Sequence, residues 1–185
     1  MSENKKSGFR KLSNDELNRP GIEEFKNLQK TPVVIVLDNI RSQHNIGSTF
    51  RSADAFAVEK VILCGICAVP PSAEIRKAAL GAEESVEWEY EEQTIDAVTK
   101  LGREGYIVIS VEQTENATML SDFSLKEGKR YAFVFGNEVK GVAQEVIDMS
   151  ELTLEIPQSG TKHSLNVSVS IGIVLWEVVK DKTTR

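Results

Sequence analysis

The sequence has few of the residues on which metal and thiol chemistry depend. Its 185 residues include two cysteines and two histidines. Cys64 and Cys67 form a Cys-x-x-Cys pair, but a zinc site needs a second pair of ligands, and His44 and His163 lie far from it in sequence. We therefore expect no metal, and we interpret the pair as two reduced thiols at the end of a strand. Such thiols are typical of a reducing cytoplasm.

Long apolar runs and nucleotide-binding glycine patterns are also missing. No run approaches the roughly 20 apolar residues of a membrane helix, and the N-terminal residues MSENKKSGFRKLSND lack the apolar centre of a signal peptide. These absences predict a cytoplasmic protein without a membrane partner. Neither G-x-G-x-x-G after the first predicted strand nor G-x-x-x-x-G-K-[ST] occurs, which disfavours a conventional nucleotide-binding enzyme.

Negative charge is concentrated in one segment. The net charge of −6 argues weakly against a nucleic-acid partner, but residues 82–128 carry three Lys or Arg against twelve Asp or Glu. A polyanion could therefore still approach the N-terminal half. The basic residues there are Lys5, Lys6, Arg10, Lys11, Arg41, Arg51, Arg76 and Lys77.

Hydrophobic patterning predicts alternating strands and helices. Short β-branched or aromatic runs predict strands at residues 33–37, 58–64, 86–90, 106–112, 131–136 and in the run that ends at 156. Helical spacing and capping signals predict helices at residues 22–30, 46–57, 72–80 and 91–105. This order predicts an α/β fold with a mostly parallel sheet covered by helices on both faces. We expect one domain over residues 32–185, preceded by a short extension over residues 1–31 whose first twelve residues are disordered.

Two places in the pattern stand out. In the helix over 46–57, capped by Asn45 or the residues just before it, the side chains of Gly47, Arg51 and Ala55 share one face. Glycine is costly inside a helix, so we expect something to approach the backbone closely there. The strands that end at Gly136 and Ile156 are each followed by a loop, which favours a ligand crevice at their ends.

The apolar segment at the end of the chain gives conflicting signals. Residues 166–173, NVSVSIGI, alternate with the period of a strand, but the continuation VLWEVV does not. A helix from Ser164 would carry Ser168, Gly172 and Trp176 along one side and would be buried on most others. The residues alone leave both structures open.

Three blocks together resemble a known family. NIGSTFR at 45–51, FGNEVKGV at 135–142 and IPQSGTKHSLNVSVS at 156–170 are similar, in order and spacing, to the three signature motifs of the SpoU (TrmH-like) RNA ribose 2′-O-methyltransferases of the SPOUT superfamily. The resemblance implies a deep trefoil knot at the C-terminal side of the sheet, and S-adenosyl-L-methionine as cofactor. It also implies a homodimer with sites near the subunit interface, and a helix in the segment from Ser164.

The resemblance also implies roles for individual residues. The expected catalytic residues are Arg51, Asn45, Glu138 and Asn166. The expected cofactor-binding residues are Gly136, Asn137, Ile156, Ser164, Leu165 and Asn166, and the expected RNA-binding residues are Arg41 and Arg51.

The implied reaction is methyl transfer to a ribose 2′-hydroxyl of RNA. Arg51 could accept the hydroxyl proton, or, since an arginine side chain is effectively always protonated, it could stabilise the developing negative oxygen. Glu138 would then orient Arg51 or Asn45. His163 suits a base by its type but has no such role in the motif. Transfer RNA is the expected substrate, because the chain has no separate N-terminal RNA-binding domain; ribosomal RNA and a non-catalytic RNA-binding homologue are the alternatives.

Overall fold

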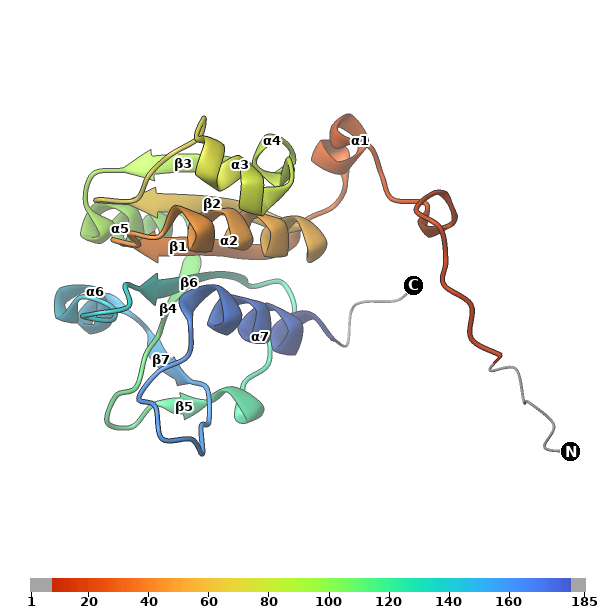
Figure 1. The fold of residues 1–185 in the computed structure, drawn as a ribbon. Helices are drawn as coiled ribbons and strands as arrows, with labels where there is room; N and C mark the ends of the chain where they lie inside the picture. The colour runs from red at the N-terminus through yellow and green to blue at the C-terminus, as the bar shows by residue number, and fades with distance from the viewer. Residues whose placement is uncertain (1–7, 181–185) are drawn as a thin grey trace, which may run out of the picture.

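A seven-stranded parallel sheet forms the centre of the protein (Figure 1). The computed structural model describes residues 8–180. Within them the strand order is β3-β2-β1-β6-β4-β7-β5, and every pair of neighbours is parallel. The strands are β1 (Thr31–Asp38), β2 (Val58–Cys64), β3 (Trp88–Glu91), β4 (Tyr106–Val111), β5 (Thr118–Met119), β6 (Arg130–Gly136) and β7 (Leu152–Glu155).

The interior strand β1 shows why the sheet is covered on both faces. Val33, Ile35 and Leu37 belong to one hydrophobic cluster, whereas Val34 and Val36 belong to another. Successive side chains of a strand point to opposite faces, so a continuous β-branched run has to be buried on both sides. The sheet therefore needs a layer of helices on each face.

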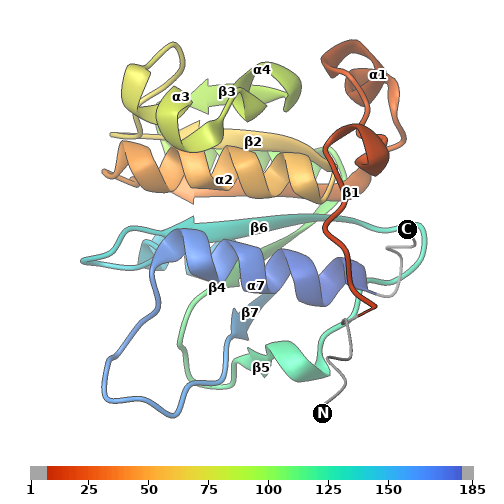
Figure 2. The same cartoon turned by 45° about the vertical axis from the view of Figure 1, so that its right-hand side comes forward.

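Figures 1 and 2 show these two layers. One face carries α2 (Gln43–Ala55), α3 (Ala73–Ala79), α4 (Ala82–Ser85) and α7 (Val167–Val179), with α2 and α7 side by side. The other face carries α5 (Thr94–Arg103) and α6 (Gln144–Met149). The predicted α/β architecture is confirmed. None of the helices within residues 8–180 combines the length and the apolar composition of a membrane span.

The N-terminal region contains the helix α1 (Ile22–Asn27) and the short 3-10 helix η1 (Asp15–Leu17). Phe25 of α1 is buried, whereas Ile22 and Leu28, which directly follows the helix, are 44% and 42% exposed. Of the residues 1–12 predicted to be disordered, residues 1–7 lie outside the described residues.

Five short elements were not predicted. They are η1, α4, α6, the two-residue strand β5, and the 3-10 helix η2 (Leu120–Asp122).

The strand suggested by the alternation of residues 166–173 is not formed, because these residues are the cap and the first turns of helix α7. Asn166 caps the helix, since its side-chain oxygen accepts a hydrogen bond from the Ser168 amide at 2.9 Å. Val167, Ile171 and Val174 are buried with helical spacing. The helix implied by the family resemblance is therefore present, but it starts at Val167 and not at Ser164. The knot stays a prediction.

Candidate functional site

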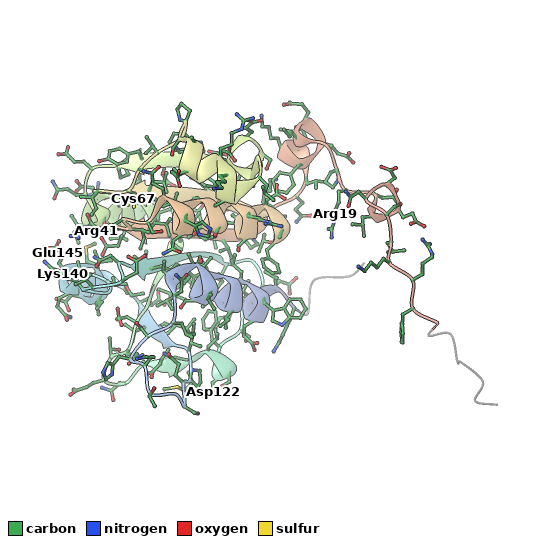
Figure 3. The ribbon with its side chains drawn as sticks, in the orientation of Figure 1. Arg19, Arg41, Cys67, Asp122, Lys140 and Glu145 are labelled. Atoms are coloured by element: carbon green, nitrogen blue, oxygen red, sulfur yellow. The ribbon has the colours of Figure 1, made fainter. Side chains whose placement is uncertain are left out.

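A cavity of about 540 Å³ lies where three neighbouring strands end. Val111, Phe135 and Leu154, at the carboxyl ends of β4, β6 and β7, line it together with the loops that follow. Figure 3 places Arg41 and Lys140 at the edge of the sheet to which β1 and β6 point. The carboxyl end of a parallel sheet is the usual place for a ligand in α/β proteins. This cavity is therefore the crevice that the sequence led us to expect.

Most of the predicted cofactor-binding residues line this cavity. Five of the six do so: Gly136, Asn137, Ile156, Ser164 and Leu165. The sixth, Asn166, follows directly in the chain and caps α7. The cavity is also lined by side chains to which the sequence gave no cofactor role, among them Glu112, Gln113, Gln158 and His163.

The loop after β6 forms one wall of the cavity. Asn137 holds the turn through its side-chain oxygen, which accepts hydrogen bonds from the amides of Val139 and Lys140 at 3.0 and 2.9 Å. The Gly141 amide closes the turn on the Asn137 carbonyl at 2.9 Å. A Cβ on Gly136 would lie 1.9 Å from the carbonyl carbon of Gly141. Only glycine therefore lets the loop fold back on the end of β6.

Two carboxylates to which the sequence gave no role hold the C-terminal end of this loop, at Val142 and Ala143. Asp38, 2% exposed, accepts hydrogen bonds from the Thr94 hydroxyl at 2.6 Å and the Ala143 amide at 3.0 Å. Glu112 accepts one from the Val142 amide at 3.0 Å. Asp38 is the last residue of β1, and Glu112 directly follows β4. An acidic residue at the carboxyl end of a buried strand is a sequence signal of a binding site. They are positioning residues for the cavity wall.

A chain of hydrogen bonds joins the three sequence motifs. The Asn45 side-chain amide donates to the Glu138 carboxylate at 2.6 Å, and the Asn166 amide donates to the Asn45 oxygen at 3.2 Å. Asn45, only 6% exposed, sits in the first turn of α2, which Ser42 caps by accepting a hydrogen bond from the Asn45 backbone amide. The cap is therefore one of the residues before Asn45, as the sequence allowed. Of the two partners expected for Glu138, the structure shows Asn45.

Arg51 lies apart from this chain of hydrogen bonds. Its side chain is exposed and lines a second cavity, of about 480 Å³, between α2 and α3. Within residues 8–180 it makes no hydrogen bond or ion pair with Glu138. Arg41 is also exposed, in the loop before α2. One chain therefore brings Asn45, Glu138 and Asn166 together but leaves Arg51 outside the first cavity.

Gly47 explains the close approach expected on α2. A Cβ there would lie 2.4 Å from the Ile75 carbonyl oxygen and 2.7 Å from the Ala78 Cβ. The group that approaches is therefore the backbone of α3, not a ligand. The glycine of the first motif allows two helices to cross closely, and this crossing shapes the second cavity.

Cys64 and Cys67 are free, buried thiols. Burial raises the pKa of Cys64 to about 12 and that of Cys67 to about 11. The Ile40 amide donates a hydrogen bond to the Cys67 sulfur at 3.2 Å. Among the residues that the structure describes, no three His, Cys, Asp or Glu side chains are grouped to hold a metal ion.

Comparisons with known proteins agree with this geometry. A sequence model described as the SpoU rRNA Methylase family matches residues 32–176. The chain is 33% identical, over 164 residues, to the 23S rRNA (guanosine-2′-O-)-methyltransferase RlmB of Salmonella typhi; the match covers 84% of this chain and 63% of that protein.

The fold is also similar to solved structures. An AdoMet-bound rRNA methyltransferase from Sinorhizobium meliloti gives a TM-score of 0.77 at 24% identity, covering 86% of this chain and 61% of the other. The A. aeolicus TrmH/SpoU tRNA modifying enzyme gives 0.76 at 21% identity, covering 87% of this chain and 82% of the other. The chain thus spans less than two thirds of the length of the curated relatives that it matches.

Proposed function

This chain belongs to the SpoU rRNA Methylase family, and on that premise we propose that it transfers a methyl group from S-adenosyl-L-methionine to a ribose 2′-hydroxyl of RNA. One observation carries the proposal. The hydrogen-bonded residues Asn45, Glu138 and Asn166, which come from three separate motifs, meet beside a cavity at the carboxyl ends of the strands.

The residues around the cavity fit the cofactor. Its volume of about 540 Å³ lies within the range of roughly 300–1,000 Å³ that is usual for small-molecule sites. When bound, S-adenosylmethionine supplies an activated methyl group on a positively charged sulfur. Glu112, Glu138 and Glu155 line the cavity and favour a cation, while Lys140 suits a carboxylate. Gly136 keeps the backbone at the end of β6 free of a side chain.

The remaining chemistry falls to side chains of the protein. Asn45 is held between Glu138 and Asn166, so its amide has one orientation at the rim of the cavity. Arg51 keeps a positive charge that stabilises the ribose oxygen as the hydroxyl proton passes to water and the methyl group leaves the sulfur for that oxygen. We favour this electrostatic role over proton acceptance because an arginine side chain has no lone pair to accept a proton while it is protonated, which it effectively always is in proteins.

A second copy of the chain is part of the proposal. Val169, Ile173 and Trp176 on α7 are 49%, 36% and 54% exposed, and their spacing places them on one face of the helix. An exposed apolar stripe of this kind is typical of a subunit contact. A dimer formed through α7 also offers a way to bring Arg51 of one copy near the cavity of the other.

Ribosomal RNA is the substrate class that we propose. Three relatives at 31–33% identity are named 23S rRNA (guanosine-2′-O-)-methyltransferases, and one at 30% identity is named a putative TrmH family tRNA/rRNA methyltransferase. They favour ribosomal RNA over the transfer RNA expected from the sequence, since that expectation rested on the extent of the chain alone.

Methyl transfer from labelled S-adenosylmethionine tests the proposal. Ribosomal and transfer RNA from cells lacking the protein would be incubated separately with the wild type, with Arg51→Ala, and with Arg103→Ala. Arg103 is an exposed arginine on the opposite face of the sheet and serves as the control. We expect label in ribosomal RNA with the wild type and the control, and loss of transfer but retained cofactor binding for Arg51→Ala.

Three results would count against parts of this account. Label in neither RNA fraction would refute the proposed activity, and label in transfer RNA alone would refute the proposed substrate. Wild-type turnover by Arg51→Ala would remove Arg51 from the mechanism.

A further inference from the structure

The cavity between α2 and α3 is a candidate site in its own right. His44, Ser48, Arg51, Ser52 and Ala55 follow one another on a single face of α2 and line it. Lys77 and Ala78 line it from α3, and Phe56 lies at its end. We infer that this α2–α3 groove binds the phosphate backbone of the RNA substrate, with Lys77 and His44 as phosphate-binding residues in addition to Arg51. The inference rests on the proposed function and adds a binding site to it.

The charge of the groove fits a polyanion. Three basic side chains and two hydroxyls line it, and no carboxylate does, although the chain as a whole carries a net charge of −6. Phosphate oxygens are bound in proteins by lysine, arginine and hydroxyl side chains of this kind. An apolar ligand would not need this set of residues.

The basic side chains of the groove are available to a ligand. Within residues 8–180, neither Lys77 nor Arg51 nor His44 makes a side-chain hydrogen bond or an ion pair with another residue. The neighbouring Arg76 differs, because it is 3.0 Å from the carboxylate of Glu84 and faces another cavity. Lysine and arginine side chains that are not already paired within the protein can neutralise phosphates of the RNA and so release the counterions condensed on it, which favours binding.

The walls of the groove are held in place before any ligand arrives. Gly47 lets α3 approach α2 closely, since a Cβ at this position would collide with Ile75 and Ala78. Ser72, which caps α3, donates a hydrogen bond to the side chain of Gln43 in the first turn of α2. Both helices are therefore tied together at the end nearest the cofactor cavity, and little ordering is needed on binding.

The position of the groove connects it with the proposed chemistry. His44 precedes Asn45, which is bonded to Glu138 at the cofactor cavity. From there the groove follows α2, a helix of 13 residues that spans about 20 Å. Figure 2 shows α2 on the outer face of the molecule, between α3 and α7. In the proposed dimer, an RNA whose ribose lies at the cavity of one copy can lay its neighbouring phosphates along α2 of the other copy, whose Arg51 comes near that cavity.

Salt-dependent RNA binding tests the groove. A short, fluorescently labelled single-stranded RNA would be titrated with the wild type, Lys77→Gln and Arg76→Gln over a range of salt concentrations. The two variants lose the same charge at adjacent positions of α3, but only Lys77 lines the groove. Cofactor affinity, measured in parallel, checks that both variants are folded.

For Lys77→Gln we expect the slope of log K against log salt to become shallower by about 0.7, the value for one phosphate contact to a single strand. This corresponds to roughly fivefold weaker binding at about 0.1 M salt and no difference near 1 M. Arg76→Gln should keep the wild-type slope.

The outcomes separate the groove from the proposed function. Equal slopes for Lys77→Gln and the wild type, or an equal loss of RNA affinity in both variants, would overturn the proposal that the groove binds phosphate. A shift of Lys77→Gln from dimer to monomer without a change in slope would make it a protein contact and would also overturn it. If the groove behaves as expected but no methyl is transferred, the RNA site stands and the proposed activity fails.

Discussion

Replacing Gly47 with alanine should destabilise the protein, whereas the same replacement at Gly102 should stabilise it. Both glycines lie inside helices, Gly47 in α2 and Gly102 in α5. A Cβ at Gly47 would meet the Ile75 carbonyl oxygen at 2.4 Å, while a Cβ at Gly102 would meet nothing within 4 Å. The same added methyl group is therefore crowded at Gly47 and free of neighbours at Gly102.

The magnitudes follow from two competing effects. Alanine is favoured over glycine inside a helix by about 0.5–1 kcal/mol, and at Gly102 this gain is unopposed. At Gly47 the added methyl group forces α3 away, and overpacking of a buried contact costs about 1–3 kcal/mol. The neighbouring atoms are backbone atoms of α3 and the Cβ of Ala78, none of which can rotate aside, so the upper part of that range applies. We expect a net loss of about 2 kcal/mol for Gly47→Ala.

Thermal unfolding measures the difference. For a protein of this size 1 kcal/mol corresponds to about 2–4 °C in Tm. Gly47→Ala should lower Tm by about 4–8 °C and Gly102→Ala should raise it by about 1–4 °C. A rise for Gly47→Ala similar to that for Gly102→Ala would show that α3 does not press on this glycine, and would refute the packing role assigned to it.

Three further predictions concern the cavity, the thiols and α7. Gly136→Ala should weaken S-adenosylmethionine binding at least ~10-fold in calorimetry, because its Cβ would lie 1.9 Å from the backbone of the loop that forms the cavity wall. Unchanged affinity would contradict the role of this loop as a wall of the cofactor cavity. Burial raises the pKa of Cys64 to about 12 and of Cys67 to about 11, so both stay protonated and should resist iodoacetamide at about pH 8 until urea unfolds the chain; rapid modification of the folded protein would contradict this. Ile173→Glu should yield monomers in sedimentation, whereas a charge at the exposed Leu80 outside α7 should not, and a dimer in both variants would exclude α7 as the contact.

Much of the fold could be predicted because its strands carry a strong local signal. Residues 33–37 are all β-branched or leucine, and such a run reads as a strand buried on both faces. Helix α7 could not be predicted from its own residues. Its small and β-branched residues alternate as in a strand, and packing against the sheet and α2 decides its conformation. Helix α6 buries only Val146, so it has too little apolar pattern to be recognised.

The candidate site was predictable in part. The three motifs gave the residues around the cavity, and the structure brings Asn45, Glu138 and Asn166 into contact. The position of Arg51 could have been inferred from helical geometry alone. Six residues at about 100° each place it roughly 120° around α2 from Asn45, and therefore on another face. Motif membership groups residues by sequence, whereas the helix separates them in space.

The position of the transferred methyl group tests the central claim most directly. RNA methylated by the protein with labelled S-adenosylmethionine would be digested to nucleosides and analysed by mass spectrometry. The account predicts that the label is found in a 2′-O-methylated nucleoside. Label on a base, or no labelled nucleoside from any RNA, would contradict it.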